Sequence, residues 1–95
     1  MVSAVVLMQI KRDAINEVAQ RLVALDGVRE VFSVAGRYDL VALLRVADNA
    51  AMATLVTEQI RDIAEIEETE TLLAFKTYAK EDMEAMFSVG FEEEA

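Results

Sequence analysis

The sequence predicts an α+β fold of the ferredoxin-like type, with the order strand, helix, strand, strand, helix, strand (βαββαβ) and an antiparallel sheet. Residues 2–10 and 40–46 are apolar at almost every position, as in strands covered on both faces. Residues 13–26 and 48–63 instead repeat apolar side chains at helical spacing. Right-handed crossovers then give the strand order 4-1-3-2, with both helices on one face.

The first half of the chain contains a central strand, a helix and an edge strand. After the strand at 2–10, Asp13 is expected to cap a helix, and Asp26-Gly27 closes it with a glycine that can adopt the left-handed conformation. Residues 28–35 form the second strand, whose charged and polar positions suit a sheet edge. The apolar face of the helix consists of Ile15, Val18, Ala19, Leu22 and Leu25.

The second half repeats this pattern after a turn at Gly36. The third strand is expected at 38–46, Asp48-Asn49 caps the second helix, and the last strand runs from about 67 to 79. The apolar stripe of the second helix consists of Met52, Leu55, Val56, Ile60 and Ile63.

The two central strands are apolar on both faces, although the helices cover only one. The remaining face has to be buried elsewhere, because 55% of this 95-residue chain is hydrophobic. We therefore expect a homo-oligomer in which two sheets face one another, a dimeric α/β barrel-type assembly. Placing lysine at Val6 or Ala42, depending on which residues face the partner, should dissociate it.

Charge and composition exclude several classes of function. Nine basic and eighteen acidic residues give a net charge of −9, and only Lys11-Arg12 are adjacent cations, so we expect no direct contact with nucleic acid. A run of 18 apolar residues and a signal peptide are both absent, which predicts a cytoplasmic protein that does not contact a membrane. The chain contains no cysteine or histidine, and we expect no cofactor, no metal site and no catalytic residue.

The last residues differ in composition from the rest of the chain. We expect one domain at 1–80 and an acidic tail at 81–95, which contains six acidic residues: Glu81, Asp82, Glu84, Glu92, Glu93 and Glu94. Met83, Met86 and Phe87 lie at helical spacing. The tail is either frayed or a short helix that docks on a neighbouring subunit.

The turn before the third strand combines Gly36, Arg37, Tyr38 and Asp39. A tight turn needs the glycine, whereas a cation, a phenol and a carboxylate beside it suggest binding. The alternative interpretation is a hairpin with a solvated tip, in which Asp39 only caps the turn.

Residues 25–40, with this Gly-x-Tyr-Asp turn, and Thr69-Glu70-Thr71 resemble the ligand-binding (RAM) domain of the Lrp/AsnC, or feast/famine, transcription regulators. The resemblance covers about residues 2–79. Those regulators carry an N-terminal helix-turn-helix domain, for which this chain has no room, so it resembles a stand-alone RAM protein.

The resemblance implies dimers that pair through their sheets, further assembly into a tetramer of dimers or a larger ring, and amino-acid effectors bound between dimers. Asp39 would bind the α-ammonium group, and backbone N–H groups near Gly36 would bind the carboxylate together with the Thr69 and Thr71 hydroxyls. Tyr38 would line the side-chain pocket or donate its hydroxyl, Arg37 would pair with the carboxylate or face water, and Glu70 would favour a cationic or polar ligand. Because the turn and Thr69–Thr71 lie toward opposite edges of one subunit, neighbouring subunits would supply different walls.

Three functions remain open. The first is a binding module, not an enzyme, that senses an amino acid, takes part in regulating amino-acid metabolism and passes the signal to a full-length Lrp/AsnC regulator. The second is a small dimeric ferredoxin-like barrel enzyme of the monooxygenase or isomerase type. The third is a purely structural oligomer.

Overall fold

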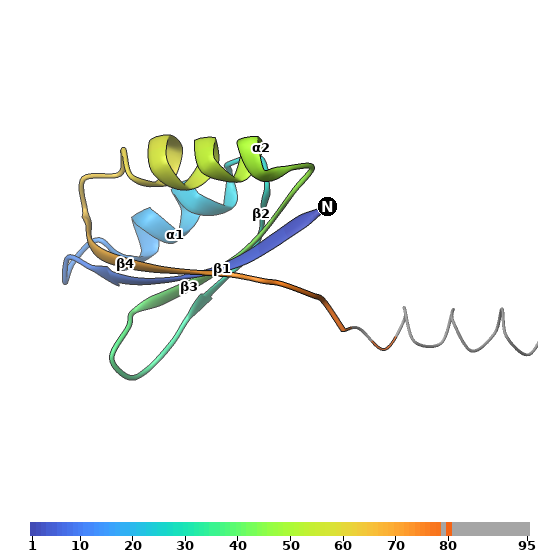
Figure 1. The fold of residues 1–95 in the computed structure, drawn as a ribbon. Coiled ribbons are helices and arrows are strands. Elements are labelled where there is room, and N and C mark those ends of the chain that lie inside the picture. Colours follow the sequence, from blue (N-terminus) through green and yellow to red (C-terminus); the bar gives the residue numbers. More distant parts are fainter. Residues whose placement is uncertain (79, 81–95) are drawn as a thin grey trace, which may run out of the picture.

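A computed structural model describes residues 1–78 and residue 80; the expected acidic tail at 81–95 lies outside the described residues. A four-stranded antiparallel sheet lies beneath two helical stretches, which cover the same face (Figure 1). The strand order is β2-β3-β1-β4, as the sequence predicts. The elements are β1 (Val2–Ile10), α1 (Ile15–Val23), β2 (Val28–Ser33), β3 (Leu40–Val46), α2 (Asn49–Thr54), the π-helix η1 (Leu55–Ile60) and β4 (Ile66–Leu73).

The hydrophobic core lies between the sheet and the helices. It is built on alternate residues of the central strands, which are buried beneath Val18 and Leu22 of α1: Ala4, Val6, Met8 and Ile10 of β1, and Leu40, Ala42 and Leu44 of β3. The residues between them face the side without helices and are only half-buried: Val5, Leu7, Val41 and Leu43. Val6 and Ala42 are therefore core residues, and the positions that could face a partner belong to the other set.

The two expected helix caps have different outcomes. Asp48 Oδ1 accepts a hydrogen bond from the Ala51 N–H at 2.8 Å, which confirms this cap. The expectation for Asp13 is wrong, because the N-cap of α1 is Ala14 and makes no side-chain capping bond. A backbone hydrogen bond of 3.0 Å from the Ala14 N–H to the Lys11 carbonyl closes the turn instead.

The last strand is shorter than the predicted range 67–79. β4 ends at Leu73, and the next residue, Ala74, donates its N–H to the Ser3 carbonyl at 2.9 Å. Since Ala4 pairs with Leu73 and β1 begins at Val2, a β4 that continued beyond Phe75 would have no neighbour with which to pair.

The second predicted helix is divided into an α-helical part, α2, and a π-helical part, η1. Leu55 and Ile60 are both buried, although two residues five positions apart point about 140° away from each other on a regular α-helix. A π-helical turn is closed by i→i+5 hydrogen bonds and is wider, so it brings both side chains back to the core.

Gly27 is held at a position that only glycine fits. Its φ is +95°, and a Cβ atom there would lie 2.7 Å from Val46 Cγ1 and 3.0 Å from Leu55 Cδ2. The left-handed residue expected after α1 is thus confirmed, and close packing adds a second requirement for glycine.

Replacing Gly27 by alanine should lower the free energy of unfolding by about 2–4 kcal/mol, because backbone strain and overpacking add. Gly36→Ala is the control: φ there is +131°, but nothing lies within 4 Å of the added Cβ, so only strain of about 1–2 kcal/mol is expected. Urea unfolding of both variants at one protomer concentration measures the difference. Equal losses would contradict the close approach at Gly27.

Candidate functional site

The turn between β2 and β3 is attached to the end of β1 by hydrogen bonds. The Asp39 N–H donates to the Met8 carbonyl at 2.9 Å, and the Gln9 side-chain amide donates to the Arg37 carbonyl at 2.9 Å. Within the hairpin, the Val34 N–H donates to the Asp39 carbonyl at 3.0 Å. The tip therefore has a defined position relative to the sheet.

Asp39 extends the pairing between β3 and β1 with its side chain. Its Oδ2 accepts a hydrogen bond of 2.8 Å from the Ile10 N–H, a donor that is partly buried. The carboxylate thus takes the place of a backbone carbonyl, which explains why β3 begins at Leu40 and not at the predicted Tyr38. The structural role that the sequence left open for Asp39 is present, and it also fixes the orientation of the carboxylate.

The tip of the turn is exposed and depends on Gly36. The positive φ of this residue favours glycine. Packing does not require glycine here, because a Cβ atom would have no neighbour within 4 Å. β2 ends at Ser33, before the predicted Ala35, because the chain is already turning there.

Arg37 and Tyr38 form a charged and aromatic pair beside the turn. The Arg37 Cζ atom lies 5.6 Å from the centroid of the Tyr38 ring. The pKa of Arg37 is raised above its ordinary value, chiefly by the Tyr38 side chain, then by the Glu70 carboxylate and, more weakly, by that of Glu68. The structure therefore brings Glu70 into the electrostatic surroundings of Arg37.

The three predicted residues of β4 do not share one face of the sheet. Thr69 pairs with Met8 and Thr71 with Val6, so both threonines belong to the helix-covered side. Glu70 pairs with Leu7 and belongs to the opposite, helix-free side. The β2–β3 hairpin also curls toward the helix-free side (Figure 1). Glu70 therefore lies on the same side of the sheet as the turn, whereas Thr69 and Thr71 lie on the other side.

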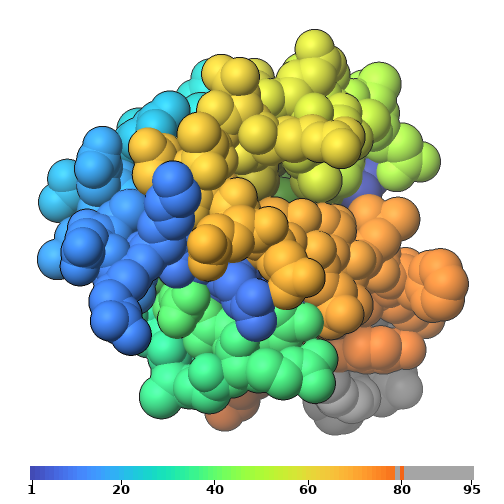
Figure 2. Space-filling model, turned by 90° about the vertical axis from the view of Figure 1, so that its left-hand side faces the viewer, coloured from blue at the N-terminus to red at the C-terminus, as the bar shows by residue number. Residues whose placement is uncertain are grey.

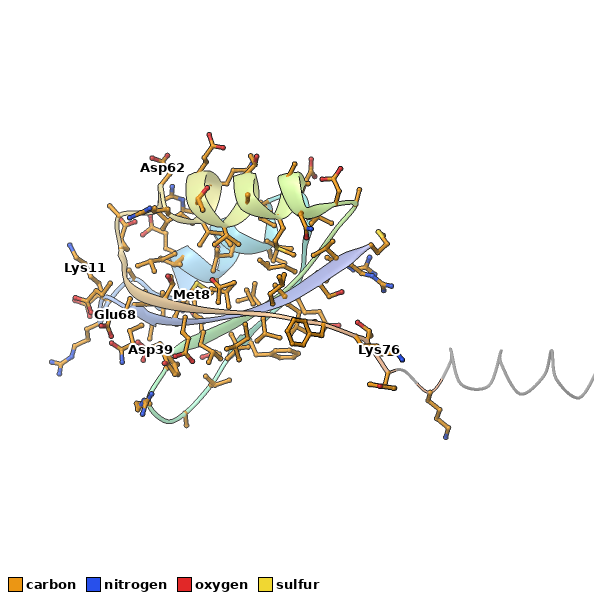
Figure 3. The ribbon with its side chains drawn as sticks, in the orientation of Figure 1. Met8, Lys11, Asp39, Asp62, Glu68 and Lys76 are labelled. Atoms are coloured by element: carbon orange, nitrogen blue, oxygen red, sulfur yellow. The ribbon has the colours of Figure 1, made fainter. Side chains whose placement is uncertain are left out.

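The turn and β4 lie closer together than expected, because the sequence placed them toward opposite edges of the sheet. Met8 pairs with Leu40 on one side and with Thr69 on the other. Only β1 separates the two groups, a distance of about 10 Å at ordinary strand spacing. Asp39 and Glu68 accordingly lie at the same end of the sheet (Figure 3).

A hollow of about 310 Å³ lies between η1 and β4, and we refer to it as the η1–β4 hollow. In the space-filling view it separates the helical stretch, in yellow, from β4, in orange (Figure 2). Thr69 is the one predicted site residue that lines it. The remaining lining residues are Val6, Val56, Thr57, Ile60, Arg61, Ile66, Glu67 and Glu68.

Sequence reasoning missed the contribution of the second helix to this hollow. The apolar stripe of Met52, Leu55, Val56, Ile60 and Ile63 fits a regular α-helix, so the sequence carried no signal for the π-helical turn. The π-helical turn carries Val56, Thr57 and Ile60, which line the hollow. Such turns occur often at functional sites.

The other features of the described residues are less suggestive of a site. A second, more open hollow of about 410 Å³ lies near Gly27 and Arg45, away from the predicted residues. In residues 1–78 and 80, no group of three or more acidic, histidine or cysteine residues is arranged to hold a metal ion. No helix in the same part of the chain is long and apolar enough to span a bilayer.

Comparisons with known proteins agree with the predicted resemblance. The profile of the Lrp/AsnC ligand binding domain matches residues 3–84. A regulator of Pyrococcus furiosus, described as an uncharacterized HTH-type transcriptional regulator, is 34% identical over 66 residues, which are 70% of this chain and 44% of that protein. The chain thus spans less than half the length of this curated relative.

Solved structures confirm the fold. The Thermus thermophilus protein TTHA0845 has a TM-score of 0.79 and 39% identity, covering 84% of this chain and all of that one. Escherichia coli AsnC has a TM-score of 0.75 over 82% of this chain and 53% of its own, and at 23% identity it supports the fold alone.

Replacing Asp39 by alanine should lower the free energy of unfolding by about 1–2 kcal/mol, because the Ile10 N–H loses its acceptor. Asp39→Asn is the matched control: its amide oxygen can still accept this hydrogen bond, so most of the stability should remain. Chemical unfolding at one protomer concentration compares the two variants. A loss of equal size in both would mean that the charge of the carboxylate, and not the hydrogen bond, stabilises the turn.

Proposed function

Since the chain belongs to the Lrp/AsnC ligand-binding domain family, we propose that it binds an amino-acid effector and assembles with copies of itself to regulate amino-acid metabolism. Regulators of this family bind amino-acid effectors and oligomerise, and one structural neighbour is a Neisseria meningitidis regulator in complex with L-Met. A full-length Lrp/AsnC regulator is a further proposed partner, through which the effector signal would reach DNA.

The observation that carries this proposal is the fixed carboxylate of Asp39 at a projecting turn. Because Oδ2 is held by the Ile10 N–H, the carboxylate is already oriented before a ligand arrives. Its second oxygen can then accept a charge-assisted hydrogen bond from an α-ammonium group with little loss of side-chain entropy. Backbone N–H groups near Gly36 would take the ligand carboxylate, and Tyr38 would close the pocket.

The threonines would contribute from a different subunit. The turn lies on the helix-free side of its own sheet, and Thr69 and Thr71 lie on the helix-covered side. One chain therefore cannot place both groups around one small ligand, whereas the turn of one subunit can reach β4 of its neighbour. A ligand held in this way binds the assembly better than the free subunit, so binding and assembly would be linked.

The helix-free face of the sheet supports assembly through a second copy. Its apolar side chains are half-buried or exposed in the single chain: Val5, Leu7, Phe32, Val41, Leu43 and Leu72. Covering several hundred Å² of such surface contributes several kcal/mol at about 25 cal/mol per Å², before the entropy of association is subtracted. A copy of the same face is the simplest cover, because each subunit has the same surplus to bury.

Leu43→Lys should convert the assembly to smaller species or monomers of 10.5 kDa at micromolar concentration, because it places a charge in the proposed interface. The lysine would lie opposite Glu30 on β2, so the folded monomer should tolerate it. Val23→Lys, on the exposed face of α1, is the control and should leave the assembly unchanged. Sedimentation velocity distinguishes these outcomes, and an unchanged Leu43→Lys assembly would contradict sheet-to-sheet pairing.

A thermal-shift screen of the twenty amino acids tests effector binding, since a ligand at 100 times its Kd adds about 2.7 kcal/mol of stability. For any amino acid that binds, Asp39→Asn should weaken binding by about 1.5–3 kcal/mol, the range for a hydrogen bond to a charged group. Calorimetry on both proteins measures this difference. Equal affinities would show that Asp39 does not contact the effector, and the absence of any shift would contradict amino-acid binding itself.

A further inference from the structure

We infer that the outer edge of β4 is a docking site for an extended, basic peptide segment of another protein, which pairs with β4 as an additional strand. The inference goes beyond effector binding and self-assembly, because it assigns a macromolecular partner of a different chemistry. β4 lies at one end of the strand order β2-β3-β1-β4, and within the described residues β1 is its one neighbour in the sheet. The other edge of β4 is therefore unpaired in the chain.

Backbone hydrogen-bonding groups of β4 point outward from this edge at every second residue. The Ala74 N–H donates to the Ser3 carbonyl, which shows that the backbone groups of Ala74 face β1. In an antiparallel ladder, consecutive residues direct their N–H and C=O groups to opposite edges of the strand. Thr69, Thr71 and Leu73 consequently direct these groups away from β1. An extended peptide can pair with such a row of donors and acceptors by β-strand addition.

The outer edge of β4 is accessible along its length. All residues from Glu67 to Leu73 are exposed, and the η1–β4 hollow separates the strand from the helical stretch (Figure 2). The one register shift in the ladder lies at the start of the strand, between Gln9 and Ile10 of β1. The chain also contains no proline. The devices that commonly block an edge strand are thus missing from 67–73.

β2, at the opposite end of the sheet, has a less suitable edge. Its ladder with β3 contains a register shift between Val28 and Glu30, and such an irregularity bends a strand and interrupts regular pairing. Arg29 and Glu30 also place both signs of charge on this short strand. Neither the backbone nor the charge of β2 therefore selects a partner as β4 does.

The charges of β4 select a basic partner over a second copy of the same strand. Glu67, Glu68 and Glu70 are its charged residues, and the whole chain has a net charge of −9. Pairing two copies of β4 would bring acidic side chains together, which is unfavourable. Lysine or arginine side chains on an added strand would instead lie beside carboxylates, and the negative field of the chain would accelerate their approach.

The two faces of β4 indicate where the basic residues of the partner should lie. Glu68 and Glu70 pair with Gln9 and Leu7 and belong to the helix-free side, where no strand residue of β4 is basic. On the helix-covered side, Arg61 lines the hollow beside Glu67, so a cation is less favoured there. Because side chains of a strand alternate between faces, the matching segment has basic residues at every second position and uncharged β-branched residues between them.

The test uses a capped hexapeptide of alternating lysine and valine, titrated calorimetrically into the full 95-residue chain. It should bind at low ionic strength and more weakly as salt is added. Replacing its lysines by glutamates should weaken binding about tenfold or more, since acids would then face acids. N-methylation of all its backbone amides retains the charge but removes the donors, and it should also weaken binding about tenfold or more.

Variants of the chain test the same edge from the other side. Thr71→Pro removes an outward N–H without removing a donor to β1, so the sheet should remain and binding of the lysine peptide should fall about tenfold or more. Thr71→Val keeps the backbone N–H and is the matched control. Glu70→Gln should weaken binding about two- to fivefold, as for an exposed ion pair. Circular dichroism checks the fold, and the N-methylated peptide decides the question if Thr71→Pro does not fold.

Several results would overturn the inference. Equal binding of the lysine peptide and its N-methylated form would show charge attraction without strand pairing. Binding of the glutamate peptide as tightly as the lysine peptide would contradict a basic partner. A lysine peptide that does not bind, together with altered sedimentation of Thr71→Pro alone, would assign this edge to a contact between copies of the chain. Absence of binding without that change would mean that the edge is not a docking site.

Discussion

Every part of the candidate site is positioned by β1, which is hydrogen-bonded along both of its edges. β3 pairs with one edge and β4 with the other, so Met8 lies between Leu40 and Thr69. The turn is attached to the end of the same strand through Met8 and Ile10. Because a strand paired on both sides cannot shift its register without breaking two ladders, the turn and the edge strand are held in a constant relation.

The same strand leaves one face of the sheet uncovered in a single chain. Its buried side chains satisfy the helix-covered side, where the core residues of β1 lie beneath α1 and η1. Its other side chains, such as Val5 and Leu7, remain half-buried on a face without a cover. The sheet also separates the turn from Thr69 within one subunit, and in the proposed assembly two subunits would bring these groups to one ligand.

The π-helical segment links the core to the hollow. The π-helical turn brings Leu55 and Ile60 closer to one side of the helix than an α-helical turn would, and residues carried on that turn line the hollow. Packing of the core and the shape of the hollow are therefore coupled. A substitution at Ile60 would change both, whereas Val56 is half-buried and is better suited to changing the hollow alone.

The sequence by itself determined the order of elements, the strand order, the helix-covered face and the turn at Gly36. These follow from local signals: residue periodicity, glycines at chain reversals, and the handedness of crossovers. Asp48 was predictable as a cap because the bond it makes spans three residues. Asp13 does not cap α1, because a backbone hydrogen bond from Ala14 to Lys11 closes that turn instead.

Only the tertiary structure decided where the candidate residues lie relative to one another. Thr69 and Glu70 point to opposite faces because strand residues alternate, but the register with β1 decides that Thr69 faces the helices and Glu70 does not. The contact between the Asp39 carboxylate and the Ile10 N–H joins residues 29 positions apart, and local sequence carries no signal for it. The η1–β4 hollow likewise depends on how a helix with a π-turn meets an edge strand. Such relations arise from packing between distant segments, whereas the elements themselves arise from neighbours along the chain.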